Sequence, residues 1–463
     1  MKRILAFAGL TLAAALTAAP AHAGKKQFDE KKIVLSLGIM SDVHIDSPDG
    51  MPSQKFEAAL NQLRDKAAES DGDGLDGVLF AGDIINNAYA DPKNYRQALW
   101  FKSVYERVFN PLDVAPVYAV GNHDVYQEFT SAAPAEAKNI SALLGPDWFQ
   151  TDVDDAARES MECRHCVIGD CHVICVTPVH AAPVVYTREC KEWLDRTLAQ
   201  ITAADPDRYV LLLTHPMIYG TVYGSELGEY WYTSDLTSIL EKYPQVITFG
   251  GHLHFPLNDP RSIWQGRFTA LGTASVRYMA IEAGKYEEMS GNTIMRDHNE
   301  YSEGLLLQFD RNGNARFTKM DFYRNATIGQ PWVIKAPAKD GSHLRTYSHL
   351  RRMEENKAPV LSTCEVTVGA SEDPEKPVSF RFAAGTDDEF VHHYVVMVKQ
   401  VRKLVVEKRI LSDFYRCPDA SDMKKEYEVK LGRLAPGSYE VYVTAFDSWG
   451  AEAAPVGQSF EIR

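Results

Sequence analysis

Residues 33–46 read IVLSLGIMSDVHID, and this stretch decides the fold. Its apolar first half, residues 33–40, has the pattern of a buried β-strand, and it runs directly into the polar residues Asp42 and His44. Residues two apart in an extended segment point to the same side, so this D-x-H motif presents a carboxylate and an imidazole together. The first predicted strand therefore ends in two potential metal ligands.

Four further apolar runs end in polar side chains in the same way. Residues 77–83 read GVLFAGD, where Gly82 lets the backbone turn so that the carboxylate of Asp83 can face inward. Single residues of this kind are more often structural, because Asn and Asp commonly bond their own backbone in polar turns. The joint occurrence favours a shared site. The other three runs are APVYAVGNHD at 115–124, YVLLLTHP at 209–216 and QVITFGGHLH at 245–254.

Helical spacing of apolar residues predicts helices at 54–68, 95–109 and 189–198, between the strands. Alternation of strand, polar loop and helix is the layout of a layered α/β domain, and residues 130–159 look loop-rich. Open α/β sheets bind ligands at the carboxyl ends of their strands. We therefore expect the five strand ends to deliver their polar residues to the same edge of one sheet.

The motif order D-x-H, G-D, G-N-H-D, H and G-H-x-H resembles the calcineurin-like metallophosphoesterase family, over about residues 31–323. The resemblance implies two mixed sheets flanked by helices and a site with two metal ions. It implies that one metal is held by Asp42, His44, Asp83 and His254, and the other by Asp83, Asn122, His215 and His252. It further implies that Asp83 bridges the metals, that His123 contacts the phosphate and protonates the leaving oxygen, and that Asp124 orients His123.

These residue types suit that chemistry. Two cations about 3.5–4 Å apart stabilise charge on a phosphoryl group and lower the pKa of a shared water, so that hydroxide is available near neutral pH. Imidazole and carboxylate ligands favour Mn, Fe, Zn or Co over Mg. One departure concerns Asn86, which stands three residues after Asp83, where purple acid phosphatases carry a tyrosine ligand and an acidic residue is common in the wider family. No predicted ligand is affected.

The substrate-binding residues stay open. Tyr219, Tyr223 and Tyr230 lie in a Gly- and Tyr-rich loop after His215, and Arg277 follows the last motif. The aromatic side chains could stack on a base or sugar, and the guanidinium could pair with a phosphate. Alternatively, the tyrosines pack the loop and Arg277 forms a surface ion pair.

The start of the chain predicts export. Lys2 and Arg3 precede an apolar run at 4–16, and Ala21-His22-Ala23 is a cleavage pattern, so residues 1–23 read as a signal peptide. A membrane anchor is the alternative, but the run is shorter than the roughly 20 residues of a spanning helix. Gly rather than Cys at position 24 gives no sign of lipid attachment. We expect a periplasmic or secreted protein with no membrane span.

The composition divides the chain. We expect the catalytic domain at 24–340, a charged linker at 341–357 and a small all-β sandwich at 358–463, which resembles a fibronectin type III module. The sandwich could cover the site, mediate dimerisation or attach the enzyme to a glycan, and the oligomeric state is not indicated. We expect a disulfide between Cys364 and Cys417.

Five of the seven cysteines lie in one short stretch. In an exported chain, clustered cysteines usually form disulfides, while Cys163-x-x-Cys166 with Cys171 could instead form a zinc site. Cys175 lies in an apolar run and is the candidate free thiol. The cysteines are Cys163, Cys166, Cys171, Cys175 and Cys190, and their pairing stays open.

The formal charge of −14 over 463 residues argues against a broad nucleic-acid or anionic-membrane surface, because polyanions are not attracted to an acidic protein without a basic patch. The sequence therefore predicts an exported dinuclear-metal hydrolase of phosphodiesters or phosphomonoesters. The alternatives are a periplasmic nucleotidase, and a non-catalytic binding protein that acts through its C-terminal sandwich. Retention of all the ligand positions speaks against the second.

Overall fold

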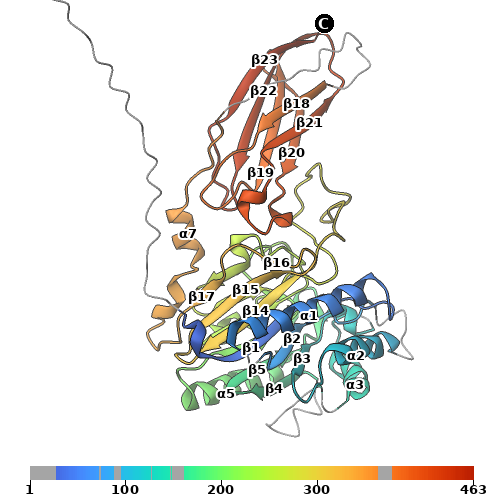
Figure 1. Cartoon of the computed structure of the whole chain (residues 1–463), viewed down its shortest axis with the longest axis vertical. Helices are drawn as coiled ribbons and strands as arrows, with labels where there is room; N and C mark the ends of the chain where they lie inside the picture. The colour runs from blue at the N-terminus through green and yellow to red at the C-terminus, as the bar shows by residue number, and fades with distance from the viewer. Residues whose placement is uncertain are drawn as a thin grey trace, which may run out of the picture.

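A computed structural model of the chain shows a larger α/β part and a smaller all-β part (Figure 1). The predicted signal peptide, residues 1–23, and Cys364 lie outside the described residues. No helix in the described part of the chain is long and apolar enough to cross a membrane. The structure describes residues 28–71, 74–87, 95–126, 128–145, 148, 161–362 and 378–462.

The first sheet has seven strands in the order β16, β15, β14, β1, β2, β3, and β17 also pairs with β15. Strands β1, β2 and β3 are parallel, whereas β14 runs antiparallel to β1. The sheet is therefore mixed, as predicted. Its strands are β1 (Ile33–Met40), β2 (Gly77–Ala81), β3 (Ala115–Ala119), β14 (Glu303–Asp310), β15 (Ala315–Asp321), β16 (Ala326–Thr327) and β17 (Trp332–Ile334).

The second sheet has six strands in the order β12, β13, β11, β8, β5, β4. The four inner strands are parallel, and the edge strands β12 and β4 are antiparallel to their neighbours. This sheet is also mixed. Its strands are β4 (Cys163–Ile168), β5 (Cys171–Val176), β8 (Val210–Leu213), β11 (Val246–Gly250), β12 (Ile263–Gln265) and β13 (Thr269–Gly272).

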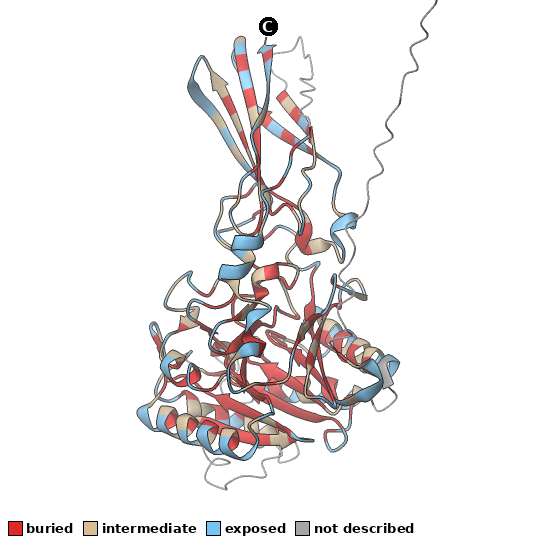
Figure 2. Cartoon of the chain, turned by 90° about the vertical axis from the view of Figure 1, so that its left-hand side faces the viewer, coloured by how far each residue is buried: buried red, intermediate tan, exposed pale blue. Residues whose placement is uncertain are grey.

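The two sheets pack face to face and carry helices on their outer faces, which confirms the predicted fold class. Leu37 and Leu79 of the first sheet share one core with Leu211 and Ile247 of the second. In Figure 2 the strands at the centre are buried, while the helices expose their outward faces. The helices are α1 (Met51–Asp71), α2 (Arg96–Val108) and α3 (Ala133–Leu144) on the first sheet, and α5 (Arg188–Ala204) and α6 (Thr237–Leu240) on the second.

The pattern of α5 explains why this segment is a helix. The Thr187 side chain accepts a hydrogen bond from the backbone of Cys190 and caps the first turn. The side chains of Cys190, Leu194, Leu198 and Ile201 are buried at helical spacing, so one stripe faces the core. In contrast, the prediction of a loop-rich segment at 130–159 is wrong where α3 forms. Proline near its first residue suits a helix start, because the missing amide hydrogen has no intrahelical partner there.

The C-terminal part is a β-sandwich whose two sheets share a core that includes Phe380, Val396 and Val441. Buried and exposed residues alternate along β21, as expected for a strand with one face on the core. The short helix α7 (His349–Glu355) precedes this part, and the predicted domain boundaries and fibronectin resemblance remain predictions. The strands are β18 (Val378–Ala383) with β21 (Glu426–Gly432), and β19 (His393–Gln400), β20 (Lys403–Leu411), β22 (Gly437–Phe446) and β23 (Val456–Ile462).

The cysteines give a mixed result. The six described cysteines, which include Cys163 and Cys190, carry free thiols, so the predicted disulfides are not shown. Cys175 is buried within β5, in the kind of strand where it was expected. Cys163 and Cys166 are three apart on β4 and so point to opposite faces of the sheet. Among the described residues, no cluster with metal-ligand geometry contains a cysteine.

Candidate metal centre

Five strand ends meet between the two sheets. The expectation that they share one edge of one sheet is wrong, because β1, β2 and β3 belong to the first sheet and β8 and β11 to the second. Face-to-face packing nevertheless brings the carboxyl ends of both sets to the same place. Asp42 and His44 follow β1, Asp83 follows β2, Asn122 follows β3, His215 follows β8, and His252 and His254 follow β11.

The side chains of all seven residues are close together and almost wholly buried, with at most 5% of each residue exposed. Asp42 Oδ1 lies 3.0 Å from His254 Nε2, and Asp83 Oδ2 lies 3.2 Å from His215 Nε2. His44 Nε2 lies 3.7 Å from both of these carboxylate oxygens. The His44 imidazole therefore stands between the two carboxylates.

The ligand atoms fall into two groups, each with its atoms within 4.8 Å of one another. One group is Asp42, His44 and His254, and the other is Asp83, His215 and His252. The amide oxygen of Asn122 lies 3.0 Å from His215 Nε2 and joins the second group. The structure thus brings all seven predicted ligands together. A third, overlapping group consists of His44, Asp83 and His123.

The backbone of the site is strained. Five of the seven residues have φ in the left-handed region, which costs a non-glycine residue roughly 1–2 kcal/mol. Such strain persists where surrounding contacts fix the conformation, and it is concentrated at functional sites. Here the backbone amides of two of them donate to the β2 loop, at 3.0 Å each. The five are Asp42 (52°), His44 (49°), Asp83 (54°), His252 (64°) and His254 (58°).

Two glycines allow the loops to approach this closely. A Cβ atom at Gly82 would stand 2.3 Å from His215 Nδ1, and one at Gly121 would stand 2.1 Å from Asp83 Oδ1. Gly82 also has a φ of +94°, which other residues rarely adopt. Both positions therefore require glycine for the ligands to occupy their observed places.

Replacing Gly82 with alanine is expected to lower the free energy of unfolding by about 2–4 kcal/mol, because positive φ and displacement of His215 both cost stability. Metal binding should weaken as well. The matched control is Gly74→Ala, whose φ is +78° but whose added Cβ meets no described atom within 4 Å. It should cost only about 1–2 kcal/mol. Urea unfolding and metal titration of both variants test this, and equal losses would contradict it.

The electrostatics of the cluster favour a cation. Burial lowers the pKa of His44 to about 4 and that of His252 to about 3, so these imidazoles are neutral. Burial alone would raise the pKa values of Asp42 and Asp83, but the surrounding imidazoles hold both well below the usual range. Burial opposes a charge on His215, yet the Asp83 carboxylate raises its pKa to about 9. A metal ion can take the place of this proton.

The hydrogen bonds of three of the four ligand histidines fit metal binding. His215 Nδ1 donates to the carbonyl of Ala81 at 2.8 Å, and His254 Nδ1 donates to the carbonyl of Tyr278 at 3.0 Å. His252 instead donates through Nε2 to the carbonyl of Tyr230, at 3.1 Å. Since one ring nitrogen is held as a donor, the other is left with a free lone pair, as in metal-binding histidines. The residues present therefore fit two metal ions.

His123 and Asp124 are placed differently from each other. His123 Nδ1 contacts the carbonyl of Asn86 at 2.5 Å, and the ring packs edge-on against His44. Asp124 is fully buried and accepts hydrogen bonds from the backbone amides of Gly121, Asp83 and Ile85. The expectation that Asp124 orients the His123 ring is wrong, because Nδ1 of that ring contacts the Asn86 carbonyl, while the Asp124 carboxylate accepts from amides of the β2 and β3 loops.

Arg277 makes an ion pair within the protein, which was the second of its two predicted roles. Its guanidinium donates to the carbonyl of His44 at 3.0 Å, to Asn86 Oδ1 at 2.5 Å and to Asp46 Oδ2 at 2.9 Å. These contacts use three of its five N–H groups. Asn86, the departure from the family pattern, thus accepts from Arg277 with its side chain and from His123 with its backbone.

A cavity of about 110 Å³, the metal-site cavity, opens onto the cluster. Of the four outer-pocket candidates, only Tyr230 lines it, and its hydroxyl accepts from Asn122 Nδ2 at 3.0 Å. Sequence reasoning missed Trp231 and Tyr278. The centroid of the Trp231 ring lies 4.6 Å from that of His252, and the centroid of the Tyr278 ring lies 4.2 Å from that of His254. Tyr278 directly follows Arg277 in the sequence. Aromatic residues next to the motif loops could therefore have been recognised as candidates for the cavity wall.

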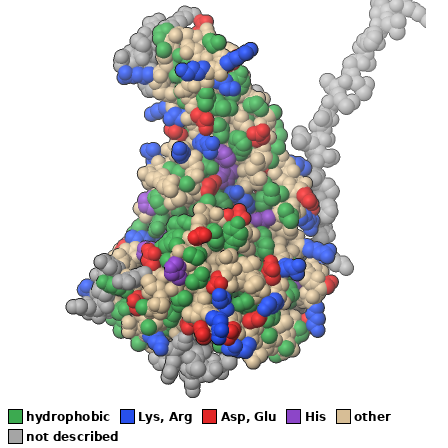
Figure 3. Space-filling model, turned by 180° about the vertical axis from the view of Figure 1, so that it is seen from behind, with side chains coloured by type: hydrophobic (Ala, Val, Ile, Leu, Met, Phe, Trp, Pro, Cys, Tyr) green, Lys and Arg blue, Asp and Glu red, His purple; other side chains and the backbone are tan. Residues whose placement is uncertain are grey.

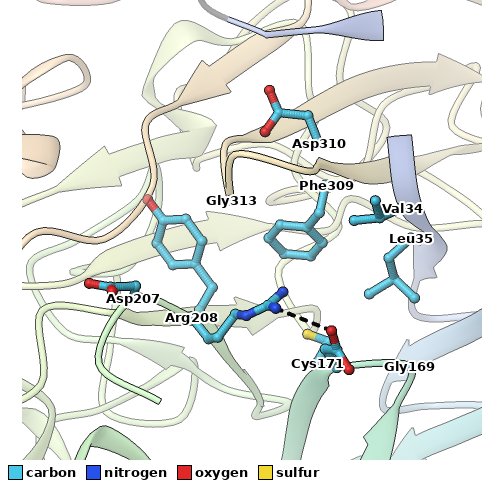
Figure 4. Close-up of a pocket in the computed structure, with 11 residues that line it drawn as sticks. Val34, Leu35, Gly169, Cys171, Asp207, Arg208, Phe309, Asp310 and Gly313 are labelled. Carbon is cyan, nitrogen blue, oxygen red and sulfur yellow. Dashed lines mark hydrogen bonds and ion pairs between the residues drawn. The ribbon is translucent and has the colours of Figure 1, made fainter. Parts of the chain in front are cut away.

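A larger cavity, of about 240 Å³, lies at the opposite ends of the strands (Figure 4). Val34, Leu35 and Phe309 form its apolar wall, and Arg208 pairs with Asp170 at its rim at 3.1 Å. None of the predicted ligands lines it. Size alone therefore does not identify the functional site, and the chemistry lies at the smaller cavity.

The sequence model of the calcineurin-like phosphoesterases matches residues 35–256. All seven predicted ligands fall within this range. A comparison with the curated proteins finds no match.

Solved structures with some similarity include a purple acid phosphatase, a 5'-nucleotidase precursor and a mannanase. A purple acid phosphatase from yellow lupin (Lupinus luteus) seeds is 14% identical over 68% of this chain and 56% of its own, with a TM-score of 0.44. A 5'-nucleotidase precursor from Thermus thermophilus is 12% identical over 92% and 89%, with a TM-score of 0.31. An endo-beta-1,4-mannanase from Thermotoga petrophila is 8% identical over 94% and 98%, with a TM-score of 0.25. The chain thus spans little over half of the lupin enzyme, and these scores carry no argument about function.

Proposed function

We propose that this protein is a metal-dependent phosphoesterase that hydrolyses phosphate esters at a dinuclear centre. The observation that carries the proposal is the pair of buried ligand groups, Asp42, His44 and His254 on one side and Asp83, His215 and His252 on the other. Two bound metal ions would stabilise charge on the phosphoryl group and supply hydroxide near neutral pH. The donor set favours Mn, Fe, Zn or Co.

The chain's own residues perform two further tasks. Asp83 and His44 stand between the two groups and fix their separation. His123 lines the metal-site cavity, and the carbonyl of Asn86 is the partner of its Nδ1. In the doubly protonated imidazolium form, Nε2–H is therefore the group that can pass a proton to the leaving oxygen, which leaves the ring neutral with its proton on Nδ1. Asp124 acts indirectly, by holding the loops that carry Asp83 and Asn122.

We further propose that diesters are preferred to monoesters. Beyond the ligand groups and His123, the described residues that line the metal-site cavity are aromatic, aliphatic or Thr293, and none is Lys or Arg. A monoester brings a second negative charge that such a wall does not compensate. A diester brings one charge and two organic groups, and these can pack against Tyr230, Trp231 and Tyr278.

The surface charge is compatible with a small-molecule substrate. On the face shown in Figure 3, Lys and Arg side chains are interspersed with Asp and Glu, and no broad basic area is present over the described residues. Together with the signal-peptide pattern at 1–23, this supports our proposal of an exported enzyme that acts on a soluble phosphoester.

Removal and return of the metal tests the function. Chelator-treated protein should lose hydrolysis of bis(4-nitrophenyl) phosphate and regain it when Mn is added, with two metal ions per chain by elemental analysis. The kcat/KM for this diester should exceed that for 4-nitrophenyl phosphate by about tenfold or more. Absence of metal-dependent hydrolysis, with fewer than two metals bound, would favour a binding protein. Hydrolysis restricted to nucleotides would favour the nucleotidase.

A further inference from the structure

A second cavity, of about 390 Å³, adjoins the metal-site cavity. Its wall consists of the loop 220–227 together with Arg261, Glu282 and His349. Leu227 lines both cavities. The second cavity is therefore a space beside the metal centre into which a substrate group could extend past Leu227.

The partition between the two cavities is thin. A Cβ atom at Gly224 would stand 2.4 Å from the Phe255 ring and 3.0 Å from Leu253 Cδ1. Phe255 and Leu253 both line the metal-site cavity, so the backbone of the loop lies directly against the back of that cavity. The partition is therefore formed by the Gly224 backbone and the Phe255 and Leu253 side chains.

The charges around the second cavity exclude a strongly anionic ligand. The buried carboxylate of Asp259 accepts from Arg261 Nε at 2.8 Å and from Arg261 Nη2 at 2.7 Å, which compensates the guanidinium charge. The other ionisable groups of the wall are acidic or neutral: Glu226 is exposed at the loop, and Glu282 is largely buried. A second phosphate would find no free positive charge here.

The wall offers hydrogen-bond donors and acceptors side by side. Arg261 binds Asp259 through Nε and Nη2, which leaves the Nη1 hydrogens as donors on the cavity wall. His349 donates through Nε2 to the carbonyl of Ile263 at 3.0 Å, and burial lowers its pKa to about 4, so its Nδ1 is an acceptor. The Glu226 carboxylate is a second acceptor. Hydroxyl groups, which both donate and accept, match such a mixture.

We propose that the second cavity is a subsite for one of the two alcohol groups of a phosphodiester, and that it takes a neutral polyhydroxylated group such as glycerol or a hexose. The inference rests on the proposed function, since it extends the same site. The volume lies within the range of about 300–1,000 Å³ that ligand pockets occupy. The apolar wall of the metal-site cavity would then face the other substituent.

Two synthetic diesters test the subsite on the metal-loaded, full-length protein. Methyl 4-nitrophenyl phosphate and glyceryl 4-nitrophenyl phosphate differ only in the polyhydroxylated group. Phosphorus NMR follows them, so that cleavage of either ester bond is counted. The kcat/KM for the glyceryl diester should be at least about tenfold higher, which corresponds to about 1.4 kcal/mol. Equal values would overturn the proposal.

A matched pair of variants locates the effect. Glu226→Trp places a large side chain at the second cavity, and the ratio of the two kcat/KM values should fall to about one. Glu229→Trp makes the same change in the same loop at an exposed residue that lines neither cavity, and the ratio should stay at the wild-type value. An unchanged ratio in Glu226→Trp would place the selectivity elsewhere and refute the subsite.

Binding without turnover separates failure of the subsite from failure of the proposed function. Saturation-transfer NMR with glycerol and methyl glucoside should show transfer to at least one of these probes in the wild type and in Glu229→Trp, and none in Glu226→Trp. If neither methyl nor glyceryl diester is hydrolysed while this pattern is observed, the esterase proposal fails, and the second cavity is a polyol-binding site but not a substrate subsite. Absence of transfer to both probes in the wild type overturns the subsite whatever the hydrolysis result.

Discussion

Asp83→Asn is expected to lower kcat/KM for bis(4-nitrophenyl) phosphate by at least about 10³-fold, or roughly 4 kcal/mol. Asp83 Oδ2 lies 3.2 Å from His215 Nε2 and 3.7 Å from His44 Nε2, so it is the carboxylate that touches both ligand groups. An amide keeps the shape and still accepts from the His123 backbone amide, as Asp83 does at 2.8 Å. It loses the negative charge on which both metal positions depend. Elemental analysis should show fewer than two metals per chain.

Asp310→Asn is the matched control for that substitution. Asp310 is equally buried and accepts hydrogen bonds from three backbone amides, but it lies at the far end of β14, by the cavity of Figure 4. It should leave the metal content and kcat/KM near wild type while costing some stability. If Asp83→Asn kept both metals and full activity, the dinuclear site would be misplaced, whereas equal effects in both variants would indicate loss of folding.

The positions along the chain of the five strands that precede the metal ligands could be predicted, because each strand has its own local sequence pattern. Apolar runs that stop at polar residues gave the ends of β1, β2, β3, β8 and β11 correctly. Helix α3 was missed, because its sequence is rich in small residues and its burial depends on contacts with α2. The division of the five strands between two sheets was missed for a related reason. Strand pairing depends on residues far apart in the sequence, so it cannot be predicted from one segment alone.

The metal ligands could be predicted from the sequence, but the hydrogen bonds that hold the ligand loops in place could not. Asp42, Asp83 and His215 follow strands, so topology alone brings them together. The partners of Asp124 are three backbone amides, and their direction depends on the turns at Gly82 and Gly121. A sequence pattern shows that an acid is present, but not which amides surround it.

The position of the C-terminal sandwich relative to the α/β part is also set by contacts between residues that are far apart in the sequence. Tyr223, which sequence reasoning offered as a substrate contact, packs on Phe255, and its hydroxyl lies 3.5 Å from Nε2 of the buried His392. Arg261 stacks over the same tyrosine ring. The sandwich therefore touches the loop that separates the two cavities. Because this loop lines the second cavity, the sandwich would affect the proposed subsite through the contact between His392 and Tyr223.

Replacing His123 with alanine is expected to lower kcat by about 10²–10⁴-fold for diesters with alkyl leaving groups, the range for loss of a general acid. Its ring lines the metal-site cavity and its Nδ1 contacts the Asn86 carbonyl, so in the imidazolium form Nε2–H is the proton that can be delivered. For a nitrophenyl leaving group the loss should be much smaller, because nitrophenolate departs without a proton. Rates on alkyl and nitrophenyl esters, with metal content measured alongside, give the comparison.

The dependence on the leaving group distinguishes proton transfer from metal binding, which matters because His123 lies within 4.8 Å of ligand atoms of both His44 and Asp83. A ligand role predicts loss of metal and an equal loss of rate for every leaving group. The control is His298→Ala. This half-buried histidine also bonds a carbonyl through Nδ1, that of Met295 at 2.8 Å, and packs against Tyr278 without lining the cavity. It should change neither rate appreciably. A uniform loss in His123→Ala with two metals still bound would refute the acid role, because a proton donor must matter most where the leaving group most needs the proton.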